Sequence, residues 1–483
     1  MSWRLTVRPM FCCRPGRRDL LRLSAVLSGF SLMSMVGERR ASASDVRPVN
    51  LELVTLTETS AIFTWYTGVA DTDDGLGRMR PAPADGEILL GTRRDRLTRT
   101  VGGAAHTPYH YVEVTGLEPG RTYYYQARSR GRTASQTSVA GAAGTPLTGG
   151  TFSFTTPQPP PGRFLFSIAL CNDLHLGETV AGLIGGLPIK GISQVPGRPP
   201  YPEIMAKALV KDARHRGATY LFAAGDVSSE AVPGDLGTAK GILDGFGAYR
   251  RDYFVARGNH DRAHDGPAYA SCRVGQWQGH DCFRDAFSDG PTYFTHDLGG
   301  LRIIGLDTYD KPGNGGDAGG LSREQFAWFE TELKEHKDQP TIVFGHHPLM
   351  SLDDPLAVSG GTSLEVGQTV SVMAAYERTP GVFLHHAGHT HRNKRTVLPG
   401  SRHVTQQEVG AVKEYPGGFN LLRVHSGGYA LNFYKTRDDL AREWSERSRQ
   451  EINGLWPQFS FGPSIADRNS VTARDLSGVR AAR

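Results

Sequence analysis

Five apolar runs in the second and third thirds of the chain each end in a short polar sequence rich in Asp, Asn and His. They read "RFLFSIALCNDLH", "YLFAAGDV", "DYFVARGNHD", "PTIVFGHHP" and "GVFLHHAGHTH". Short runs rich in Phe, Val and Ile predict buried strands. Segments with a helical apolar period, such as 202–217 and 322–337, lie between them. Strands that alternate with helices predict an α/β fold whose sheets are covered by helices.

The polar endings are expected to meet at one edge of the sheet, because residues just past the carboxyl ends of strands gather in one crevice. Asp-x-His and His-x-His spacing places side chains i and i+2 on the same side of an extended chain. Carboxylate, amide and imidazole groups together suit Fe, Mn or Zn. The sequence therefore predicts a metal site, with candidate residues Asp173, His175, Asp226, Asn259, His260, His346, His389 and His391.

This ordered set of motifs resembles the calcineurin-like metallophosphoesterase superfamily over roughly residues 164–435. The resemblance implies an α+β four-layer sandwich of two mixed sheets flanked by helices. It also implies two bound metal ions, and Fe, Mn or Zn are the metals expected. By that resemblance one metal is held by Asp173, His175 and His391, the second by Asn259, His346 and His389, and Asp226 bridges them.

The activity that this resemblance implies is hydrolysis of a phosphomonoester or phosphodiester by metal-activated hydroxide. Two ions about 4 Å apart lower the pKa of a shared water and stabilise both the attacking and the leaving oxygen. His260 lies outside the ligand set and is predicted to face the substrate, where it assists the leaving group. Asp261 is predicted to orient the ring of His260.

The neighbouring polar residues are expected to have supporting roles. His385 and His386 lie within the last apolar run, where a packed or solvent-facing imidazole is expected. His347 follows a predicted ligand, and either a substrate contact or a hydrogen bond behind the ligands fits its position. Arg392 and Asn393 are expected at the rim of the site.

The first part of the chain has a different pattern. Residues 46–156 contain short alternating runs such as "AIFTWYT" and "HYVEVTGLEPGRTYYYQA", which predict a β-sandwich. They resemble a fibronectin type III-like domain and, more narrowly, the N-terminal domain of purple acid phosphatases. The proline-rich "TTPQPPPGR" predicts a linker. The catalytic domain is then expected over 163–436, and a helical extension with a loose tail over 437–483.

One position departs from the purple acid phosphatase pattern. Those enzymes carry a tyrosine three residues after the bridging Asp, and Ser229 stands there in this chain. A tyrosinate-bound ferric iron and a purple colour are therefore not expected. Two loops, 177–203 and 263–282, follow His175 and Asp261, and each is either a wall of the substrate site or a surface elaboration.

Residues 1–43 resemble a cleavable twin-arginine signal. They contain the pair Arg17–Arg18, an apolar run over 20–36 and "ASA" at 41–43. Export by the twin-arginine machinery to the periplasm, the cell surface or the medium is therefore predicted, and Arg22 makes a permanent membrane span unlikely. In an oxidising compartment Cys272 and Cys282 are either a disulfide or two separate thiols. Cys171 is expected to be buried.

The charge distribution bears on the alternatives. Residues 1–43 carry eight arginines and two acidic residues, a net charge of +6, so the rest of the chain carries −1 of the total formal charge of +5. A nearly neutral body gives no strong signal for nucleic-acid binding, which disfavours a nuclease of the same superfamily. A non-catalytic binding or adhesion protein on the same scaffold is the other alternative. A small phosphate ester is the expected partner.

Overall fold

The computed structural model describes residues 46–72, 79–136, 150–182, 191–312, 316–349, 361–454 and 456–482. The predicted export signal at 1–43 lies outside these residues. All of the described residues belong to one compact unit, 41–483. Within the described ranges, no helix has the length and apolar character needed to cross a membrane.

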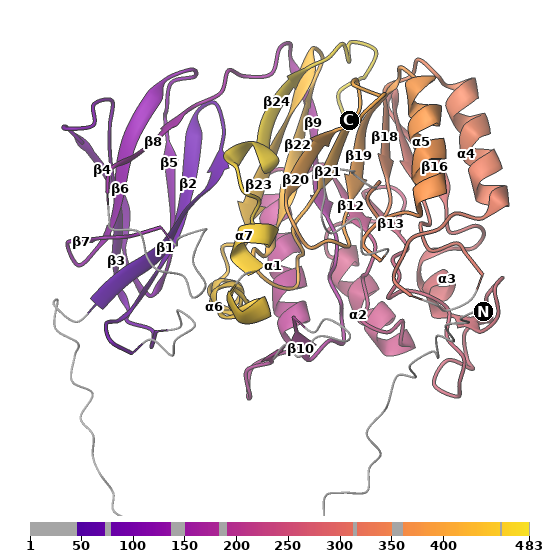
Figure 1. Ribbon diagram of the computed structural model, residues 1–483, viewed down its shortest axis with the longest axis horizontal. Coiled ribbons are helices and arrows are strands. Elements are labelled where there is room, and N and C mark those ends of the chain that lie inside the picture. Colours follow the sequence, from indigo (N-terminus) through magenta and orange to yellow (C-terminus); the bar gives the residue numbers. More distant parts are fainter. Residues whose placement is uncertain are drawn as a thin grey trace, which may run out of the picture. The chain divides into compact units, whose positions relative to one another are not determined.

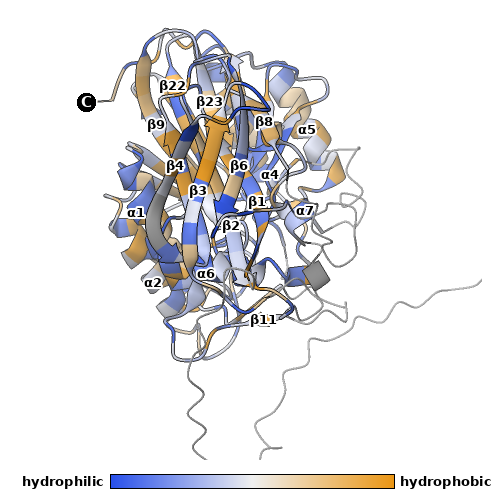
Figure 2. Cartoon of the chain, turned by 90° about the vertical axis from the view of Figure 1, so that its left-hand side faces the viewer, coloured by the Kyte–Doolittle hydropathy of each residue, from blue (hydrophilic) through white to orange (hydrophobic). Residues whose placement is uncertain are grey.

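A β-sandwich forms the first part of this unit. One sheet has the order β1 (Val46–Leu56), β2 (Ser60–Val69) and β5 (Tyr109–Thr115). The other has the order β4 (Arg99–Thr107), β3 (Ala84–Gly91), β6 (Thr122–Ser129) and β7 (Arg132–Thr133), and β8 (Phe152–Thr155) also pairs with β6. Buried and partly exposed residues alternate along β6. Figure 2 looks onto this second sheet, where apolar residues of β3 are flanked by hydrophilic ones.

The core of the sandwich is built from aromatic side chains. The ring of Phe63 lies 4.6 Å from the ring of Tyr125 and 6.0 Å from that of Phe154. Trp65 is buried, and its indole nitrogen donates a hydrogen bond to Ser129 Oγ at 2.9 Å. These aromatic residues are therefore structural, as the alternating pattern predicts.

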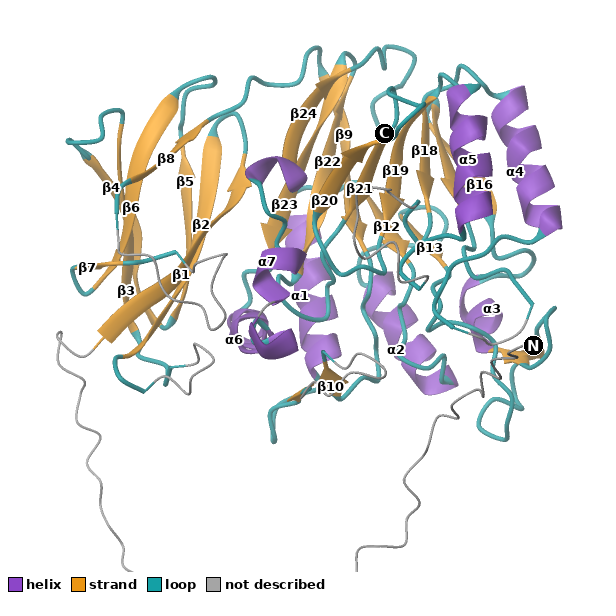
Figure 3. Cartoon of the chain, viewed as in Figure 1, coloured by secondary structure: helices purple, strands orange, loops and turns teal. Residues whose placement is uncertain are grey.

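Two six-stranded sheets form the second part (Figures 1 and 3). The first has the order β13 (Tyr253–Ala256), β12 (Tyr220–Ala224), β9 (Phe164–Cys171), β22 (Gly418–His425), β23 (Gly428–Lys435) and β24 (Asn469–Ala473). The second has the order β16 (Phe294–Leu298), β17 (Leu301–Gly305), β18 (Thr341–Phe344), β19 (Val382–Ala387), β21 (Thr405–Glu408) and β20 (Lys394–Val397). Both sheets are mixed, because parallel strands at their centres adjoin antiparallel ones.

Helices cover the outer faces of both sheets. Helices α1 (Tyr201–His215) and α2 (Pro233–Asp244) share a buried apolar cluster with the first sheet. Helices α4 (Arg323–Glu335) and α5 (Val366–Glu377) pack on the outer side of the second sheet. Between the sheets, Phe222 of β12 stacks on Phe344 of β18 at 5.1 Å. The predicted four-layer fold, preceded by a β-sandwich, is confirmed.

The end of the chain differs from the sequence-based expectation. Helix α6 (Asp439–Ser448) forms as predicted. The segment expected to be a loose tail instead continues through η3 (Glu451–Gly454), α7 (Trp456–Ser460) and η4 (Ile465–Asp467) into β24. Strand β24 pairs antiparallel with β23, so the prediction of a loose tail is wrong. Its sequence, "NSVTA", has only two apolar residues and carries no strong strand signal.

Buried charges join the sandwich to the second part. Glu52 of β1 lies 2.6 Å from Lys435 Nζ and 3.0 Å from an Arg449 nitrogen, and the Tyr415 hydroxyl donates to it at 2.6 Å. Burial alone would raise the pKa of Glu52, but the two cations outweigh it and lower the pKa to about 2. This carboxylate is therefore ionised and paired in the folded protein.

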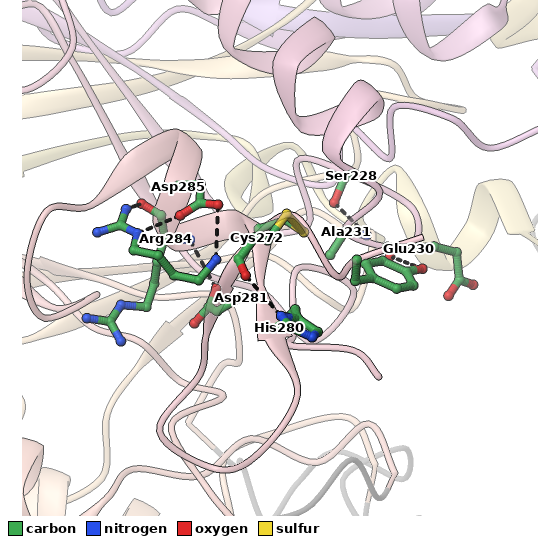
Figure 4. The surroundings of a disulfide bond; sticks show 11 residues. Ser228, Glu230, Ala231, Cys272, His280, Asp281, Arg284 and Asp285 are labelled. Atoms are coloured by element: carbon green, nitrogen blue, oxygen red, sulfur yellow. Dashed lines mark hydrogen bonds and ion pairs between the residues drawn. A yellow bond between two sulfur atoms is a disulfide. The ribbon is translucent and has the colours of Figure 1, made fainter. Parts of the chain in front are cut away.

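A disulfide between Cys272 and Cys282 closes the second half of the loop 263–282, which answers the question left open by the sequence. The short strands β14 (Arg273–Val274) and β15 (His280–Asp281) pair within it, and α3 (Cys282–Phe287) follows. Figure 4 shows His280 beside this bond, where its ring nitrogen donates to the Cys272 carbonyl at 2.9 Å. The remaining described cysteine, Cys171, is buried.

Candidate metal centre

The predicted ligands from separate strand ends meet in one buried cluster. His391 Nε2 lies 3.1 Å from Asp173 Oδ1, and His346 Nε2 lies 3.0 Å from Asp226 Oδ2. Sets of ligand atoms that lie within 4.8 Å of one another comprise Asp173–His175–His391, Asp173–Asp226–His346, His175–Asp226–His260 and His346–His347–His389. The structure thus brings together every histidine and aspartate that the sequence predicts as a ligand.

The topology explains this convergence. Strands β9, β12 and β13 are parallel neighbours, and so are β18 and β19. Their carboxyl ends therefore open at the same edge of each sheet. Because the two sheets pack face to face through residues such as Phe222 and Phe344, these two edges meet at one place.

The backbone at this edge is unusually bent. The residues with a left-handed backbone include five predicted ligands: Asp173 (φ 54°), His175 (46°), Asp226 (50°), His389 (67°) and His391 (52°). Residues other than glycine rarely adopt this conformation, and it tends to occur at functional sites. Gly258, which precedes the predicted ligand Asn259, is also tightly packed, because a Cβ atom added to it would lie 2.1 Å from Asp226 Oδ1.

The donor atoms suit metal ions. Within the described residues, Asp173 Oδ1, His175 Nε2 and Asn259 Oδ1 are buried and have no hydrogen-bond partner. Buried polar atoms are almost always paired, and an absent ion is one explanation for those that are not. A mixed set of carboxylate, amide and imidazole donors also matches Fe, Mn or Zn. The residues present therefore fit the two metals that the sequence predicts, and the individual ligand assignments stay predictions.

Two carboxylates behind the ligands were not predicted from the sequence. Glu414 Oε1 lies 2.6 Å from His391 Nδ1, and Glu178 Oε2 lies 3.2 Å from His175 Nδ1. Lys413 connects them, since its Nζ lies 2.7 Å from Glu178 and 3.5 Å from Glu414. Carboxylates that hold the far nitrogen of a ligating histidine fix its ring and tautomer. Neither Glu178 nor Glu414 lies in a strand-end motif, so local patterning gives no signal for them.

The electrostatics of the cluster favour cations. Burial raises the pKa of Asp173 and Asp226, but neighbouring histidines outweigh it and hold both well below the usual range. Burial lowers the pKa of His391, yet Asp173 and Glu414 raise it to about 9. These carboxylates favour a protonated, positively charged histidine. A bound metal cation would take the place of that proton.

His260 lies beside the cluster but is held differently from the prediction. Its Nδ1 donates to the Ser229 carbonyl at 2.7 Å, which leaves Nε2 for other contacts. Burial, the largest cause, lowers the pKa of His260.

The prediction that Asp261 orients the His260 ring is wrong. The Asp261 carboxylate accepts hydrogen bonds from the backbone N–H groups of Val227, Ser228 and Gly258 and from the Ser228 hydroxyl. It therefore ties the Asp226 loop to the Asn259 loop. Its sequence position next to His260 does not reveal this, because its partners Ser228 and Val227 lie 33 and 34 residues away.

The remaining histidines of the region are structural. His347 Nδ1 lies 2.7 Å from Thr308 Oγ1, and its Nε2 lies 2.9 Å from the Asp317 carbonyl. His385 is buried in β19, where its Nδ1 lies 2.6 Å from the Tyr376 hydroxyl. His386 is also buried there, and its Nε2 contacts the Cys171 carbonyl at 3.2 Å.

The expected rim position of Arg392 and Asn393 is wrong. Both residues are buried. Arg392 Nε lies 2.7 Å from Glu408 Oε2, and the Asn393 backbone N–H donates to the Ser460 carbonyl at 2.9 Å. The polar character of these side chains suggested exposure, but each has a buried partner that lies far from it in the sequence.

Comparisons with known proteins agree with this architecture. Residues 166–393 match the family of calcineurin-like phosphoesterases, and residues 46–156 match the N-terminal domain of purple acid phosphatases. A probable glycerophosphodiester phosphodiesterase of Arcobacter nitrofigilis is 30% identical over 99 residues, which cover 20% of this chain and 33% of that protein. A probable cyclic nucleotide phosphodiesterase of Rhodococcus erythropolis is 29% identical over 218 residues, 42% of this chain and 66% of that protein.

These relatives are matched over a third and just under two thirds of their lengths. Among solved structures, the purple acid phosphatase PPD1 of yellow lupin is 15% identical, with a TM-score of 0.39 over 81% of this chain and 73% of that one. The two domain matches define the family more firmly than this distant likeness. The chain therefore joins a purple acid phosphatase-type N-terminal domain to a domain of the calcineurin-like phosphoesterases, which are metal-dependent phosphoric ester hydrolases.

Proposed function

We propose that the chain is an exported phosphoesterase that hydrolyses phosphomonoesters or phosphodiesters at a centre of two metal ions. The observation that carries this proposal is the buried cluster of carboxylates and imidazoles from five strand ends, with unpaired donor atoms on Asp173, His175 and Asn259. The arginine pair Arg17–Arg18 supports export. The names of the two relatives, both probable phosphodiesterases, support activity on diesters.

The metal ions would supply Lewis acidity for the phosphoryl oxygens and a nucleophile from water. Asp173, His175 and His391 would hold one ion, Asn259, His346 and His389 the other, and Asp226 would bridge them. The Asp226 Oδ1 also accepts a hydrogen bond from the His260 backbone N–H at 2.8 Å, which fixes this bridging carboxylate.

His260 is the residue proposed to exchange a proton with the substrate. The Ser229 carbonyl holds the Nδ1–H, so Nε2 is the nitrogen that remains for the ester oxygen. Its ring lies 4.6 Å from the ring of His175, which places it at the edge of the ligand cluster. Ser229 contributes this carbonyl, and it replaces the tyrosine on which a purple chromophore would depend.

The test combines metal content with turnover. Elemental analysis of the purified protein should give close to two metals per chain, and the protein should hydrolyse para-nitrophenyl phosphate or its bis ester. Asp226→Asn should lower kcat by at least about 10²-fold, because it weakens metal-centred charge stabilisation. A metal-free protein that stays inactive after Mn, Zn or Fe is added would overturn the proposal. The same signal sequence fused to a reporter should direct export that depends on Arg17 and Arg18.

A further inference from the structure

A cavity of about 230 Å³ is lined in part by Arg262, which follows the predicted ligand Asn259 by three residues. One side is formed by Gly275–Gln278, at the tip of the disulfide-closed loop, and by Arg262 at its base. The opposite side is formed by Tyr293, Tyr309 and Lys311, which lie near strands β16 and β17. Residues of the loop 263–282 therefore form part of the cavity wall.

The walls of this cavity are aromatic on more than one side. Trp277 is 37% exposed, and its indole nitrogen donates to Asp310 Oδ1 at 3.0 Å, which anchors the side chain. Tyr309 is held by a hydrogen bond from its hydroxyl to the Gly316 carbonyl at 2.9 Å. Tyr293 contributes a third ring, which packs against Trp328. An anchored, partly exposed indole is well suited to stack against a planar ligand.

The walls carry both basic and acidic side chains, and Arg262 is the cation on which recognition of an electron-rich ligand would depend. Arg257 is already paired, since it lies 2.5 Å from Asp281 and 3.4 Å from Asp307. Arg262 has a different environment. Its Nη1 donates to the carbonyl of Asn259 and its guanidinium interacts with the Tyr309 side chain, whereas its Nε is buried without a hydrogen-bond partner in the described structure. A guanidinium with unsatisfied donors binds planar oxygen acceptors well.

Two contacts connect the cavity to the metal centre. Arg262 donates through Nη1 to the backbone carbonyl of Asn259, a predicted ligand, at 3.2 Å. The ring of Tyr309 stacks on His347 at 6.3 Å, and His347 adjoins the ligands His346 and His389. A substrate with its phosphoryl group at the metals would therefore have this cavity within reach of an attached organic group.

We propose that this cavity binds the organic group of the phosphate ester, and that it selects a planar aromatic group bearing hydrogen-bond acceptors. Trp277 is the stacking surface and Arg262 the acceptor-binding group. This inference rests on the proposed function, because it assigns the substrate class of the same site. It also gives the disulfide-closed loop a role as a specificity wall.

The test measures binding rather than turnover, so that it can fail independently of the proposed activity. Phenylphosphonate, the methylene phosphonate analogue of adenosine monophosphate, and methylphosphonate all carry a phosphorus–carbon bond that the enzyme does not hydrolyse. Calorimetric titration of the metal-loaded full-length protein should show that both aromatic ligands bind roughly tenfold or more tightly than methylphosphonate, because stacking contributes to affinity. Tighter binding of the adenosine analogue than of phenylphosphonate would identify a nucleobase as the favoured group.

Trp277→Ala should remove most of the preference for aromatic ligands and leave methylphosphonate affinity unchanged. Trp277→Phe keeps a ring and should retain part of the preference. Val274→Ala is the matched control, since Val274 lies in the same loop, is 69% exposed and does not line the cavity. Equal affinity of the wild type for aromatic and methyl ligands would overturn the inference, as would an unchanged preference in Trp277→Ala. Normal binding preference in a protein without hydrolytic activity would instead contradict the proposed function alone.

Discussion

Glu414 Oε1 lies 2.6 Å from Nδ1 of His391, while Nε2 of the same ring lies 3.1 Å from Asp173 Oδ1. The carboxylate therefore holds the ring by its outer nitrogen and leaves the inner nitrogen toward the cluster. Glu178 lies behind His175 in a similar position, but its Oε2 is 3.2 Å from Nδ1, which is an ion-pair distance rather than a hydrogen bond. Both predicted histidine ligands of one metal thus have a carboxylate behind them, and Lys413 compensates the added negative charge.

Glu414→Gln should weaken metal binding by about 10- to 100-fold, because removal of a carboxylate behind a ligating histidine usually has an effect of this size. Competition with a coloured chelator measures the affinity directly and does not depend on activity. Glu443→Gln is a suitable control, since Glu443 forms a surface ion pair with Arg198. Identical metal affinities in the two variants would show that the His391–Glu414 contact has no role in holding metal.

His260→Ala should lower kcat by about 10²- to 10⁴-fold, the range typical of a lost proton-transfer group. Metal content and melting temperature should stay near the wild-type values, because His260 is not among the proposed ligands. Steady-state kinetics on esters whose leaving groups differ in pKa provide the measurement. The defect should be largest for the poorest leaving group, and a uniform defect across the series would argue against proton transfer by His260.

Asp261→Ala is expected to act on stability instead. The variant leaves the buried backbone N–H groups of Val227, Ser228 and Gly258 without their acceptor. Each unsatisfied buried group costs about 1–3 kcal/mol, so a loss of several kcal/mol in the free energy of unfolding is expected. Denaturant titration tests this. A variant with wild-type stability and reduced kcat would restore the catalytic role that the sequence suggested.

Glu52→Gln should lower the free energy of unfolding by about 3–5 kcal/mol at neutral pH, because it leaves Lys435 and Arg449 buried without their carboxylate. The folded pKa of Glu52, about 2, lies below its ordinary value of 4.5. Its contribution is therefore fully present above pH 4.5 and is lost as the pH falls toward 2. Urea titrations at several pH values measure this, with the exposed pair residue Glu118→Gln as control.

The contribution of Asp307 to the free energy of unfolding should have the opposite pH dependence. Burial is the largest cause that raises its pKa, and despite the opposing charge of Arg257 the pKa reaches about 6, compared with an ordinary 3.8. The folded state therefore binds a proton more tightly, and the free energy of unfolding falls as the pH rises from about 4 through 6. The shift corresponds to a loss on the order of 3 kcal/mol. Asp307→Asn should flatten this part of the stability profile, whereas the exposed Asp338→Asn should not.

The sequence predicts the catalytic fold and the candidate ligands well because both depend on local patterns. An apolar run that ends in Asp-x-His or His-x-His marks a strand and its tip in a few residues. Parallel pairing then brings the tips together without further information. The same reasoning identifies α4, whose Ser322 caps the first turn by accepting from the Gln325 N–H.

The parts that were missed depend on contacts between distant residues. Strand β4 contains "VGGAA", which lacks a strand pattern, and it forms because β3 offers a paired edge. Glu178 and Glu414 are recognisable only once His175 and His391 have been placed in space. The role of Asp261 likewise depends on backbone groups of another loop, and the pairing of Cys272 with Cys282 is a choice between alternatives that spacing alone leaves open.

The order of strands in the first sheet sets when the catalytic domain can form during synthesis. Strand β9 is made early but lies between β12 and β22, and β22 follows it by about 250 residues in the chain. The sheet is finished only by β24, which begins about 300 residues after the end of β9. One of the proposed metals likewise has its full set of ligands only after His391 has been synthesised, because His391 shares that metal with Asp173. The N-terminal β-sandwich, whose last strand β8 ends at Thr155, can thus form on a ribosome-bound chain well before the first sheet of the catalytic domain has all of its strands.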